Sequence, residues 1–545
     1  MRGCWLIGLL LGVLTVLALS RGHRDVGYAR DEGIYFEASR RYAAWVDRLW
    51  HEPSKAMKPA VRDRAFAINH EHPALMKTIA GVSARALVGS EPNRDASLTE
   101  GAAMRLPAQI MAGFGVALLF WVGAHLGGIW AGLLCAGWFI TLPRVWFHAG
   151  LHAFDVPVAV ATLAVALVYR ASLRRPAWGL ALGPVLGLAI AVKHNALFLG
   201  PLLAVHYWAC LAFARWRHDR PITRAQLFPL PLVSMAVAAP LTAWASWPWL
   251  WRDTWPRLQA YFEFHRHHSW YNMEFLGANF NQPPMPIGYV AVMTWATVPT
   301  VCLLLALGGL ALWARSNLHE PAAEATESPS FARPLPDGWA TLDGWGVAVL
   351  AAFPLVLISL PSTPIFGGTK HWITAYPFLA IGAAYGWSRL WRAASLRVRR
   401  WLEPIGVLIC LAPSTIATID GHPYNLSQYA PMVGGPRGAA DLGLNRGFWG
   451  HAVLPLVPVA AEITGPRAGF YLHDVHALAH QQYVREGRWP ENLQPTAVGN
   501  AKAGLLFHEL HMTTWELELW NQMQTTAPAS VITLDDVPLT SLYAR

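Results

Sequence analysis

Charged side chains are scarce in this chain. They make up 14% of its 545 residues, whereas about 25% is usual in soluble proteins. Hydrophobic residues reach 54%, and the 28 tryptophans fit aromatic belts at the two surfaces of a bilayer. This balance argues against three or four soluble domains, which the length alone would allow. It predicts a polytopic α-helical membrane protein.

Cysteine is also rare, and its spacing fits neither a metal site nor a redox motif. All five cysteines lie in apolar stretches, and none forms a CxxC pair (Cys4, Cys135, Cys210, Cys302, Cys410). A disulfide framework and a cysteine metal site are therefore unsupported. The net charge of +9 does not indicate nucleic-acid binding, because the arginines lie in short runs between apolar segments, as in cytoplasmic loops facing anionic lipid.

Eleven apolar segments indicate about eleven transmembrane helices. They lie near 4–20, 106–126, 129–143, 154–169, 178–192, 196–214, 227–247, 289–313, 344–361, 372–389 and 402–418. Several are shorter than the ~20 residues of a straight span. With a cytoplasmic N-terminus, the arginine-bearing connections lie inside (170–177, 215–226, 314–340, 389–400). The short outer connections hold only Arg144, Lys193 and Lys370, so the positive-inside rule sets the orientation.

Three large pieces then lie on the outer, periplasm-like side. They are a first loop, 21–104, with an amphipathic helix at roughly 33–50, a second loop, 248–288, and the tail, 420–545. Helix-like stretches alternate with strand-like runs in the tail, which predicts a small C-terminal α/β domain. The first apolar segment ends in a sequence that also fits a signal-peptidase site (Ala18-Leu19-Ser20), but we favour an uncleaved anchor.

Polar motifs on this outer face are the candidates for chemistry. Asp31-Glu32 follows the first segment, and Asp155 lies at the mouth of the fourth. Carboxylates are costly in hydrocarbon, so they belong in an aqueous loop or cavity at the membrane surface. Lys193 lies in a tight turn between two apolar segments, at the depth of a lipid phosphate. Lys77 lies in the first loop, shortly after His70-Glu71-His72.

Each motif also has a structural explanation. The acid pair could be part of a solvated loop, and either lysine could simply extend to the membrane interface. Asp155 could cap a helix that begins near Pro157, which does not exclude catalysis. The second outer loop carries three histidines that could bind a metal or merely be polar (His265, His267, His268).

The order of these motifs resembles the C-type (GT-C) membrane glycosyltransferases. Within that superfamily it is similar to the family 39-like branch, which includes protein O-mannosyltransferases and bacterial aminoarabinose transferases of lipid A. The matching motifs are Asp31-Glu32, His72-Pro73-Ala74-Leu75 with Lys77, Asp155, and the run 187–193, which begins Gly-Leu-Ala and ends in Lys193. Further matches are 247–251, Phe264-His265, Pro283-Pro284 and Lys370-His371-Trp372. The resemblance spans roughly 20–440, and Ala74 departs from the second proline of the family's His-Pro-Pro-Leu motif.

The resemblance implies a GT-C-like catalytic domain over 1–419 and an outer domain over 420–545. The donor would be a sugar on a polyprenyl phosphate, and the acceptor a hydroxyl on a lipid, glycan or protein. Asp31 would be the base, Glu32 would orient it or the acceptor, and Asp155 would position the acceptor or a sugar hydroxyl. Lys77 and Lys193 would bind the phosphate, with Arg105 and Lys370 in reserve, and His72 and His265 are further site candidates.

Single displacement would invert the anomeric centre. No cofactor is required by the sequence, although the acids and histidines could supply ligands for a divalent metal. The main alternative is a transporter or flippase for a lipid-linked or anionic solute, and an inactive scaffold is a third. Transporters often show inverted repeats and sites at the midplane, whereas these acids gather at one face. The expected location is a bacterial inner membrane with the site and C-terminus in the periplasm.

Overall fold

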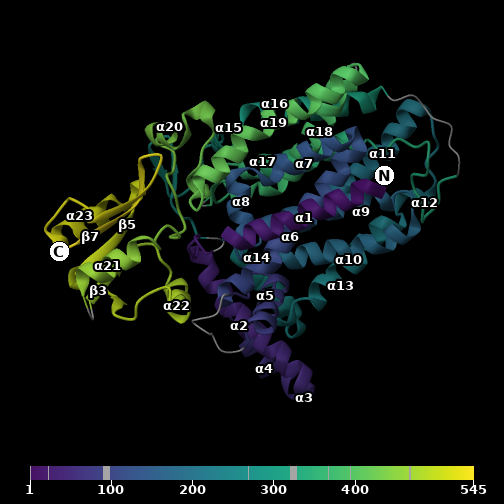
Figure 1. The fold of residues 1–545 in the computed structure, drawn as a ribbon. Helices are drawn as coiled ribbons and strands as arrows, with labels where there is room; N and C mark the ends of the chain where they lie inside the picture. The colour runs from purple at the N-terminus through teal and green to yellow at the C-terminus, as the bar shows by residue number, and fades with distance from the viewer. Residues whose placement is uncertain are drawn as a thin grey trace.

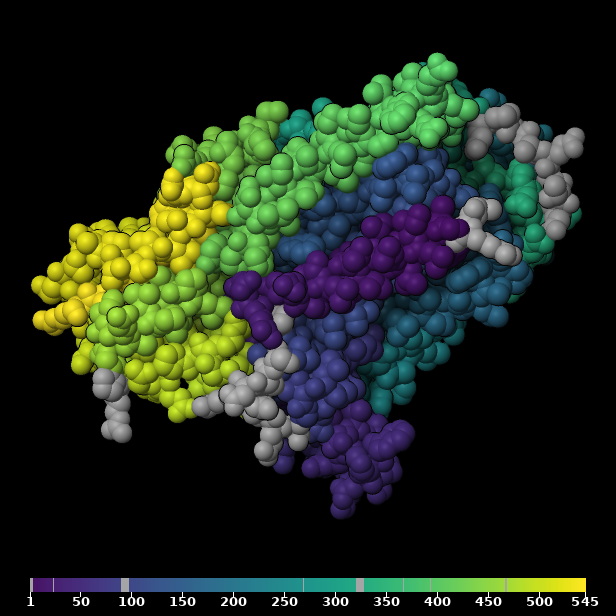
Figure 2. Space-filling view, in the orientation of Figure 1, coloured from purple at the N-terminus to yellow at the C-terminus, as the bar shows by residue number. Residues whose placement is uncertain are grey.

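A computed structural model describes residues 2–22, 24–89, 98–267, 269–319, 328–365, 367–392, 394–465 and 468–545. Figure 1 shows a bundle of long helices with the N-terminus at one end and a smaller mixed region, which holds the C-terminus, at the other. The helix α1 (Arg2–Gly22) lies on the outside of the bundle (Figure 2), and side chains such as Trp5 and Leu6 are exposed along it. Such apolar exposure fits contact with lipid rather than water.

Within the described ranges, seven helical segments are long and apolar enough to cross a membrane. They are Gly3–Gly22, Glu100–Gly127 (α6), Asp155–Ser172 (α9), His194–His218, Arg224–Ala245, Thr300–Leu318 (α16) and Leu396–Gly421 (α19). The segments that begin at His194 and Arg224 contain α11 (Leu199–His218) and α13 (Leu230–Ala245). The protein is therefore a multi-pass membrane protein, as its composition predicts.

Each of the eleven apolar segments coincides with helix, although the count of eleven crossings stays a prediction. The four remaining segments contain the shorter helices α7 (Ile129–Ile140), α10 (Pro176–Val192), α17 (Asp343–Ile358) and α18 (Tyr376–Arg392), and the segment 289–313 contains α15 (Tyr289–Thr297) ahead of α16. The predicted span 289–313 is broken between α15 and α16, where Pro299 precedes the second helix. A proline removes a backbone donor and disfavours helix in the residue before it. A second break bends α7 by 70° from α8 (Pro143–Gly150).

The first outer loop is mostly helical. It contains α2 (Arg30–His51), α3 (Pro53–Ala56), α4 (Pro59–Phe66) and α5 (Leu75–Leu87). The amphipathic helix predicted at 33–50 is thus confirmed as α2. Gly33 lets this helix lie against α22 (Ala477–Arg485), because a Cβ there would meet the backbone nitrogen of Ala479 at 2.4 Å.

The tail contains a five-stranded mixed sheet. Its strands, in the order β4-β3-β5-β7-β6, are β4 (Leu493–Pro495), β3 (Ala468–Leu472), β5 (Ala503–Phe507), β7 (Val537–Ala544) and β6 (Ser530–Leu534). The strand-like runs of the tail include 469–472 and 530–534, which fall on β3 and β6. The helices of this region are α20 (Gly435–Asp441), α21 (Leu456–Thr464), α22 and α23 (Thr513–Met523). The proposed boundary at 419/420 remains a prediction.

The second outer loop carries α14 (Thr254–Arg266) and a two-stranded hairpin, β1 (Met273–Phe275) and β2 (Ala278–Phe280). It meets the tail where the amide of Gly277 donates to the carbonyl of Gly443 at 2.9 Å. Further short elements are α12 (Arg224–Leu227) and the 3-10 turns η1 (His194–Phe198), η2 (Pro248–Trp251), η3 (Gly368–His371), η4 (Ile373–Ala375), η5 (Asn425–Ser427), η6 (Pro431–Val433), η7 (Val498–Asn500) and η8 (Leu510–Met512). The second outer loop and the tail are therefore in direct contact.

Candidate active site

A cavity of about 820 Å³ lies where the membrane helices meet the outer loops and the tail. Residues from all three parts of the chain line it, including Asp31, Asp155, Lys193, Tyr271, Lys370 and Trp449. The size is within the range of small-molecule sites. Motifs that are hundreds of residues apart in the sequence therefore share one chamber, as the resemblance predicts.

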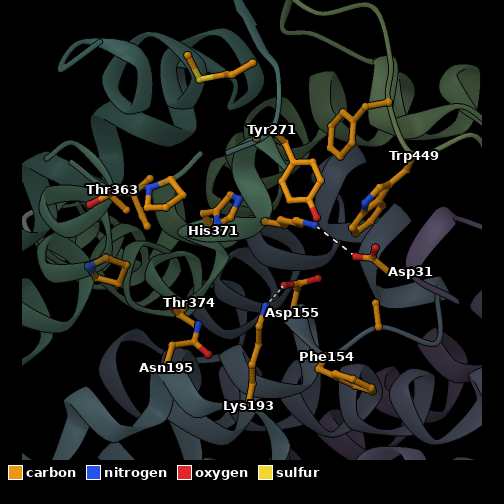
Figure 3. A pocket seen from close by; sticks show the side chains of 18 of the residues that line it. Asp31, Phe154, Asp155, Lys193, Asn195, Tyr271, Thr363, His371, Thr374 and Trp449 are labelled. Atoms are coloured by element: carbon orange, nitrogen blue, oxygen red, sulfur yellow. Dashed lines mark hydrogen bonds and ion pairs between the residues drawn. The ribbon is translucent and has the colours of Figure 1, made fainter. Parts of the chain in front are cut away.

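Two carboxylate–lysine pairs face each other in this cavity (Figure 3). The Nζ of Lys193 lies 2.6 Å from Oδ1 of Asp155, and the Nζ of Lys370 lies 3.6 Å from Oδ2 of Asp31. The side chain of Asp31 is 34% exposed, whereas that of Asp155 is 6% exposed. Asp31 is thus the carboxylate that a solute in the cavity can reach more easily.

Local structure places both acids at helix N-termini. Asp31 lies in the first turn of α2, and Asp155 is the first residue of α9. The free backbone amides and the dipole at a helix N-terminus stabilise negative charge. Lys193 directly follows the last residue of α10, and its amide donates to the carbonyl of Ala189. Helix ends thus position three of the four charged groups.

Lys370 is buried in η3 beneath an aromatic ring. Its Nζ lies 3.9 Å from the ring centroid of Trp449. Burial lowers the pKa of Lys370, while the neighbouring Asp31 and Asp155 act in the opposite direction. The carbonyl of Trp449 accepts from the amide of Arg30 at 2.9 Å. The tail therefore contributes directly to the surroundings of Asp31.

Glu32 and Arg105 do not line the cavity. They form a fully buried ion pair, with Nε and Nη2 of Arg105 at 2.7 and 2.6 Å from the two carboxylate oxygens of Glu32. Glu32 also accepts from the amides of Ala29 and His152. The guanidinium of Arg105 fixes the start of α2 through these bonds, and its reserve role in binding phosphate stays a prediction. Glu32 lies next to Asp31 in the same helical turn, so its contacts hold the backbone that carries Asp31.

Lys77 is also turned away from the cavity. Its ammonium donates to the carbonyl and side-chain oxygens of Asn69 and to the carbonyl of His72, at 2.7, 2.8 and 3.1 Å. Burial lowers the pKa of Lys77 to about 7, although Glu71 acts to raise it. The prediction of a direct phosphate contact for Lys77 is therefore not supported. The lysine instead shapes the turn that carries His72 into the cavity lining.

The histidine candidates separate in the structure. His72, His194 and His265 line the cavity and bring ring nitrogens within 4.8 Å of one another, a spacing that could hold a metal ion. Burial, together with nearby cations, holds the pKa of His72 well below its usual range. His267 instead pairs with Glu263 at 2.7 Å, and His268 lies outside the described residues.

Arg144 is the main cavity residue that the candidate set omitted. Its guanidinium lies over the ring of Tyr429 at 4.7 Å, and its side chain lines the cavity while being almost fully buried. The sequence could have indicated Arg144, because it is one of the few cations in the short outer connections. The three cations of the short outer connections (Arg144, Lys193, Lys370) all line this one cavity.

A second omission is an acidic group contributed by the second outer loop and the tail. Glu274, Asp474, Glu509 and His511 line the cavity together. Burial and the neighbouring Asp474 and Glu274 hold the pKa of Glu509 well above its usual range. Burial also raises the pKa of Asp474, and Arg30 opposes this at 3.4 Å. Single-sequence patterns did not indicate that these segments meet.

Apolar side chains also line the cavity. They belong to η1 and α11 (Phe198, Leu199, Leu202) and to α17 (Leu350, Phe353, Leu357, Ile358). These helices belong to the apolar bundle. The cavity therefore joins a charged region to a surface suited to hydrocarbon.

Comparison with known proteins identifies the fold. No family model matches the chain, and no curated protein sequence matches it. Among solved structures, ArnT from Cupriavidus metallidurans bound to undecaprenyl phosphate has a TM-score of 0.50 at 14% identity, covering 98% of this chain and 97% of that one. Apo ArnT from the same organism has a TM-score of 0.49 at 12% identity, covering 98% of this chain and 97% of that one.

The oligosaccharyltransferase of Archaeoglobus fulgidus gives a TM-score of 0.48 at 10% identity, with 95% of this chain and 70% of that one covered. The likeness to ArnT bound to undecaprenyl phosphate spans nearly the whole length of both chains. The chain has the fold of ArnT, and the GT-C-like fold expected from its motifs is confirmed.

Proposed function

We propose that this protein is a membrane glycosyltransferase that moves a sugar from a polyprenyl phosphate to a hydroxyl acceptor. One observation carries the proposal: the three cations of the short outer connections and the carboxylates of Asp31 and Asp155 line one cavity, which apolar side chains of α11 and α17 line as well. A polyprenyl phosphate sugar has the complementary parts, namely an anionic phosphate, a hydroxyl-rich sugar and a hydrocarbon chain. The solved ArnT structure with the same fold is bound to undecaprenyl phosphate.

The phosphate is the leaving group, so its growing negative charge must be stabilised. Arg144, Lys193 and Lys370 supply fixed positive charge at the cavity wall. Preorganised cations in a site sheltered from water stabilise such a charge more strongly than mobile solvent does. A guanidinium offers two parallel donors to phosphate oxygens, and an ammonium acts as a point charge. No strong acid catalyst is needed, because the phosphate leaves as an anion.

Asp31 acts as the general base. The acceptor hydroxyl transfers its proton to the Asp31 carboxylate as its oxygen bonds to the anomeric carbon, and the bond to the phosphate oxygen breaks with its electron pair on the phosphate. This single displacement inverts the anomeric centre. Asp155 is held by Lys193 at 2.6 Å and positions a sugar or acceptor hydroxyl.

The donor class stays open between hexose, pentose and amino sugar, and the acceptor between lipid, glycan and protein. We place the cavity and the tail on the periplasmic side of a bacterial inner membrane, because the arginine-bearing connections lie at the opposite side. A polyprenyl donor would then enter from the outer leaflet between α11 and α17.

The test is turnover by purified protein in detergent. Wild-type protein is incubated with a panel of polyprenyl-phosphate sugars, and loss of sugar from the donor, to an acceptor or slowly to water, is measured. Turnover of one donor without a sealed membrane supports the transferase. Movement of donor across sealed vesicles with the sugar–phosphate bond intact would instead support the transporter or flippase.

A further inference from the structure

A group of acidic side chains at the rim of the cavity has no role in the proposed transfer. Glu274 comes from β1 in the second outer loop, whereas Glu509 and His511 come from the segment that follows β5 in the tail. One ligand atom from each of the three lies within 4.8 Å of the other two. Loop and tail, more than 230 residues apart in sequence, thus contribute to one small cluster.

The individual contacts bring the imidazole between the two carboxylates. The Nδ1 of His511 lies 3.6 Å from Oε1 of Glu274 and 3.6 Å from Oε2 of Glu509. The side-chain amide nitrogen of Asn272 lies 2.8 Å from the same Nδ1. The Glu274 carboxylate accepts a hydrogen bond from the backbone amide of Leu510. The segment is therefore held in place by backbone and side-chain contacts around the cluster.

Glu509 provides a second, independent observation. Its side chain is only 9% exposed, and its Oε1 is buried with no hydrogen-bond partner among the described residues. An unpartnered buried carboxylate oxygen is costly, and buried charges in proteins are normally paired or bound to a metal. Glu509 is also among the residues that line the cavity.

The local charge also calls for a cation. Glu274, Glu509 and Asp474 bring three carboxylates together, with side chains 6%, 9% and 8% exposed. Arg30 is the basic side chain paired with them, through Asp474 at 3.4 Å, and it is half-exposed. A divalent ion would balance the remaining negative charge.

We propose that Glu274, Glu509 and His511 form a divalent transition-metal site that fastens the second outer loop to the C-terminal sheet. Two carboxylates and one imidazole are a donor set suited to Zn²⁺ or Mn²⁺. Asp474 stands beside the site as a further source of oxygen. The ion stabilises the cavity wall, and the transfer chemistry proceeds on the separate groups around Asp31.

The experiment uses full-length protein in detergent, stripped with a chelator and titrated with Zn²⁺. Because His72, His194 and His265 could also bind zinc, every protein carries His265→Gln. Bound zinc is measured by equilibrium dialysis with elemental analysis, and thermal unfolding is followed in parallel. A metal that binds only the folded state raises the unfolding temperature.

Glu509→Gln and His511→Gln should each weaken zinc binding more than about tenfold, since even the loss of an outer-shell partner costs 10- to 100-fold. Without zinc, Glu509→Gln should unfold at the same or a higher temperature than its parent, because it removes a buried acid that lies beside the carboxylates of Glu274 and Asp474. Glu518→Gln removes an exposed acid from α23 in the same region and should leave zinc binding unchanged.

Two results would overturn the proposal. One is the absence of saturable zinc binding in the parent protein, which would leave these carboxylates to face an organic cation. The other is zinc binding that survives both Glu509→Gln and His511→Gln. The donor-turnover assay is separate from these readouts, so failure of the metal site and failure of the transferase proposal can be told apart.

Discussion

Glu32 belongs to the motif that suggested catalysis, and because its carboxylate is buried in an ion pair with Arg105 we predict that it stabilises the fold. Its carboxylate accepts four hydrogen bonds, two from Arg105 and two from backbone amides, and both charged side chains are 1% exposed. Glu32→Gln keeps the shape but leaves the Arg105 charge buried without an anion. Breaking a buried pair on one side costs about 3–5 kcal/mol, so we expect a loss of that size in the free energy of unfolding.

The assay is unfolding by SDS in mixed micelles, with Arg105→Met and the double variant measured alongside. The double variant should cost up to about 3 kcal/mol less than the sum of the single changes, because the two groups are in direct contact. Asp47→Asn is the control: Asp47 lies on the same helix as Glu32, and the change breaks its exposed pair with Arg85 of α5, which should cost less than about 1 kcal/mol. Unchanged stability together with lost donor turnover in Glu32→Gln would refute the assignment and give Glu32 a chemical role.

Two further predictions concern the cations of the cavity. Lys193→Met should lower donor turnover by about 100-fold, the usual scale for losing one preorganised charge-stabilising group. Lys193→Arg keeps the positive charge and should retain most of the turnover. Equal turnover in wild type and Lys193→Met would contradict this prediction. Burial lowers the pKa of Lys370, so its charge, and with it donor binding, should be lost on raising the pH sooner than for an exposed lysine. Lys370→Arg keeps its charge and should shift the alkaline loss of donor binding to higher pH. An identical pH profile in wild type and Lys370→Arg would show that Lys370 does not bind the phosphate.

The sequence predicted the membrane fold well because hydrophobicity and charge act locally. Each apolar segment coincides with helix, and α2 was expected close to its observed position. The break between α15 and α16 was missed, although Pro299 marks it. Amino-acid composition alone hardly distinguishes one continuous span from two short apolar helices joined by a bend.

The site was predicted in part. The positions of Asp31, Asp155, Lys193 and Lys370 on one outer face follow from topology, and the structure brings them into one cavity. The partners of Lys77 and Arg105 depend on which way a side chain turns, and this is settled by packing rather than by position in the chain. Arg144 had been recognised only as a marker of topology.

The contribution of the tail was beyond the reach of single-sequence patterns. Glu274 and His511 approach each other only because the second outer loop packs against the segment after β5. Neither segment carries metal-ligand spacing of its own. Long-range pairing of this kind depends on the tertiary fold.

The most direct test of the central claim compares donor turnover in Asp31→Asn and Asp25→Asn. Both changes remove one negative charge from the same stretch of chain, but Asp31 lines the cavity, whereas Asp25 is exposed and interacts with His422. With the polyprenyl-phosphate sugar that wild-type protein turns over, Asp25→Asn should keep its activity, and Asp31→Asn should lose it by at least about 100-fold, within the usual range for general-base catalysis. Full turnover in Asp31→Asn would contradict the account.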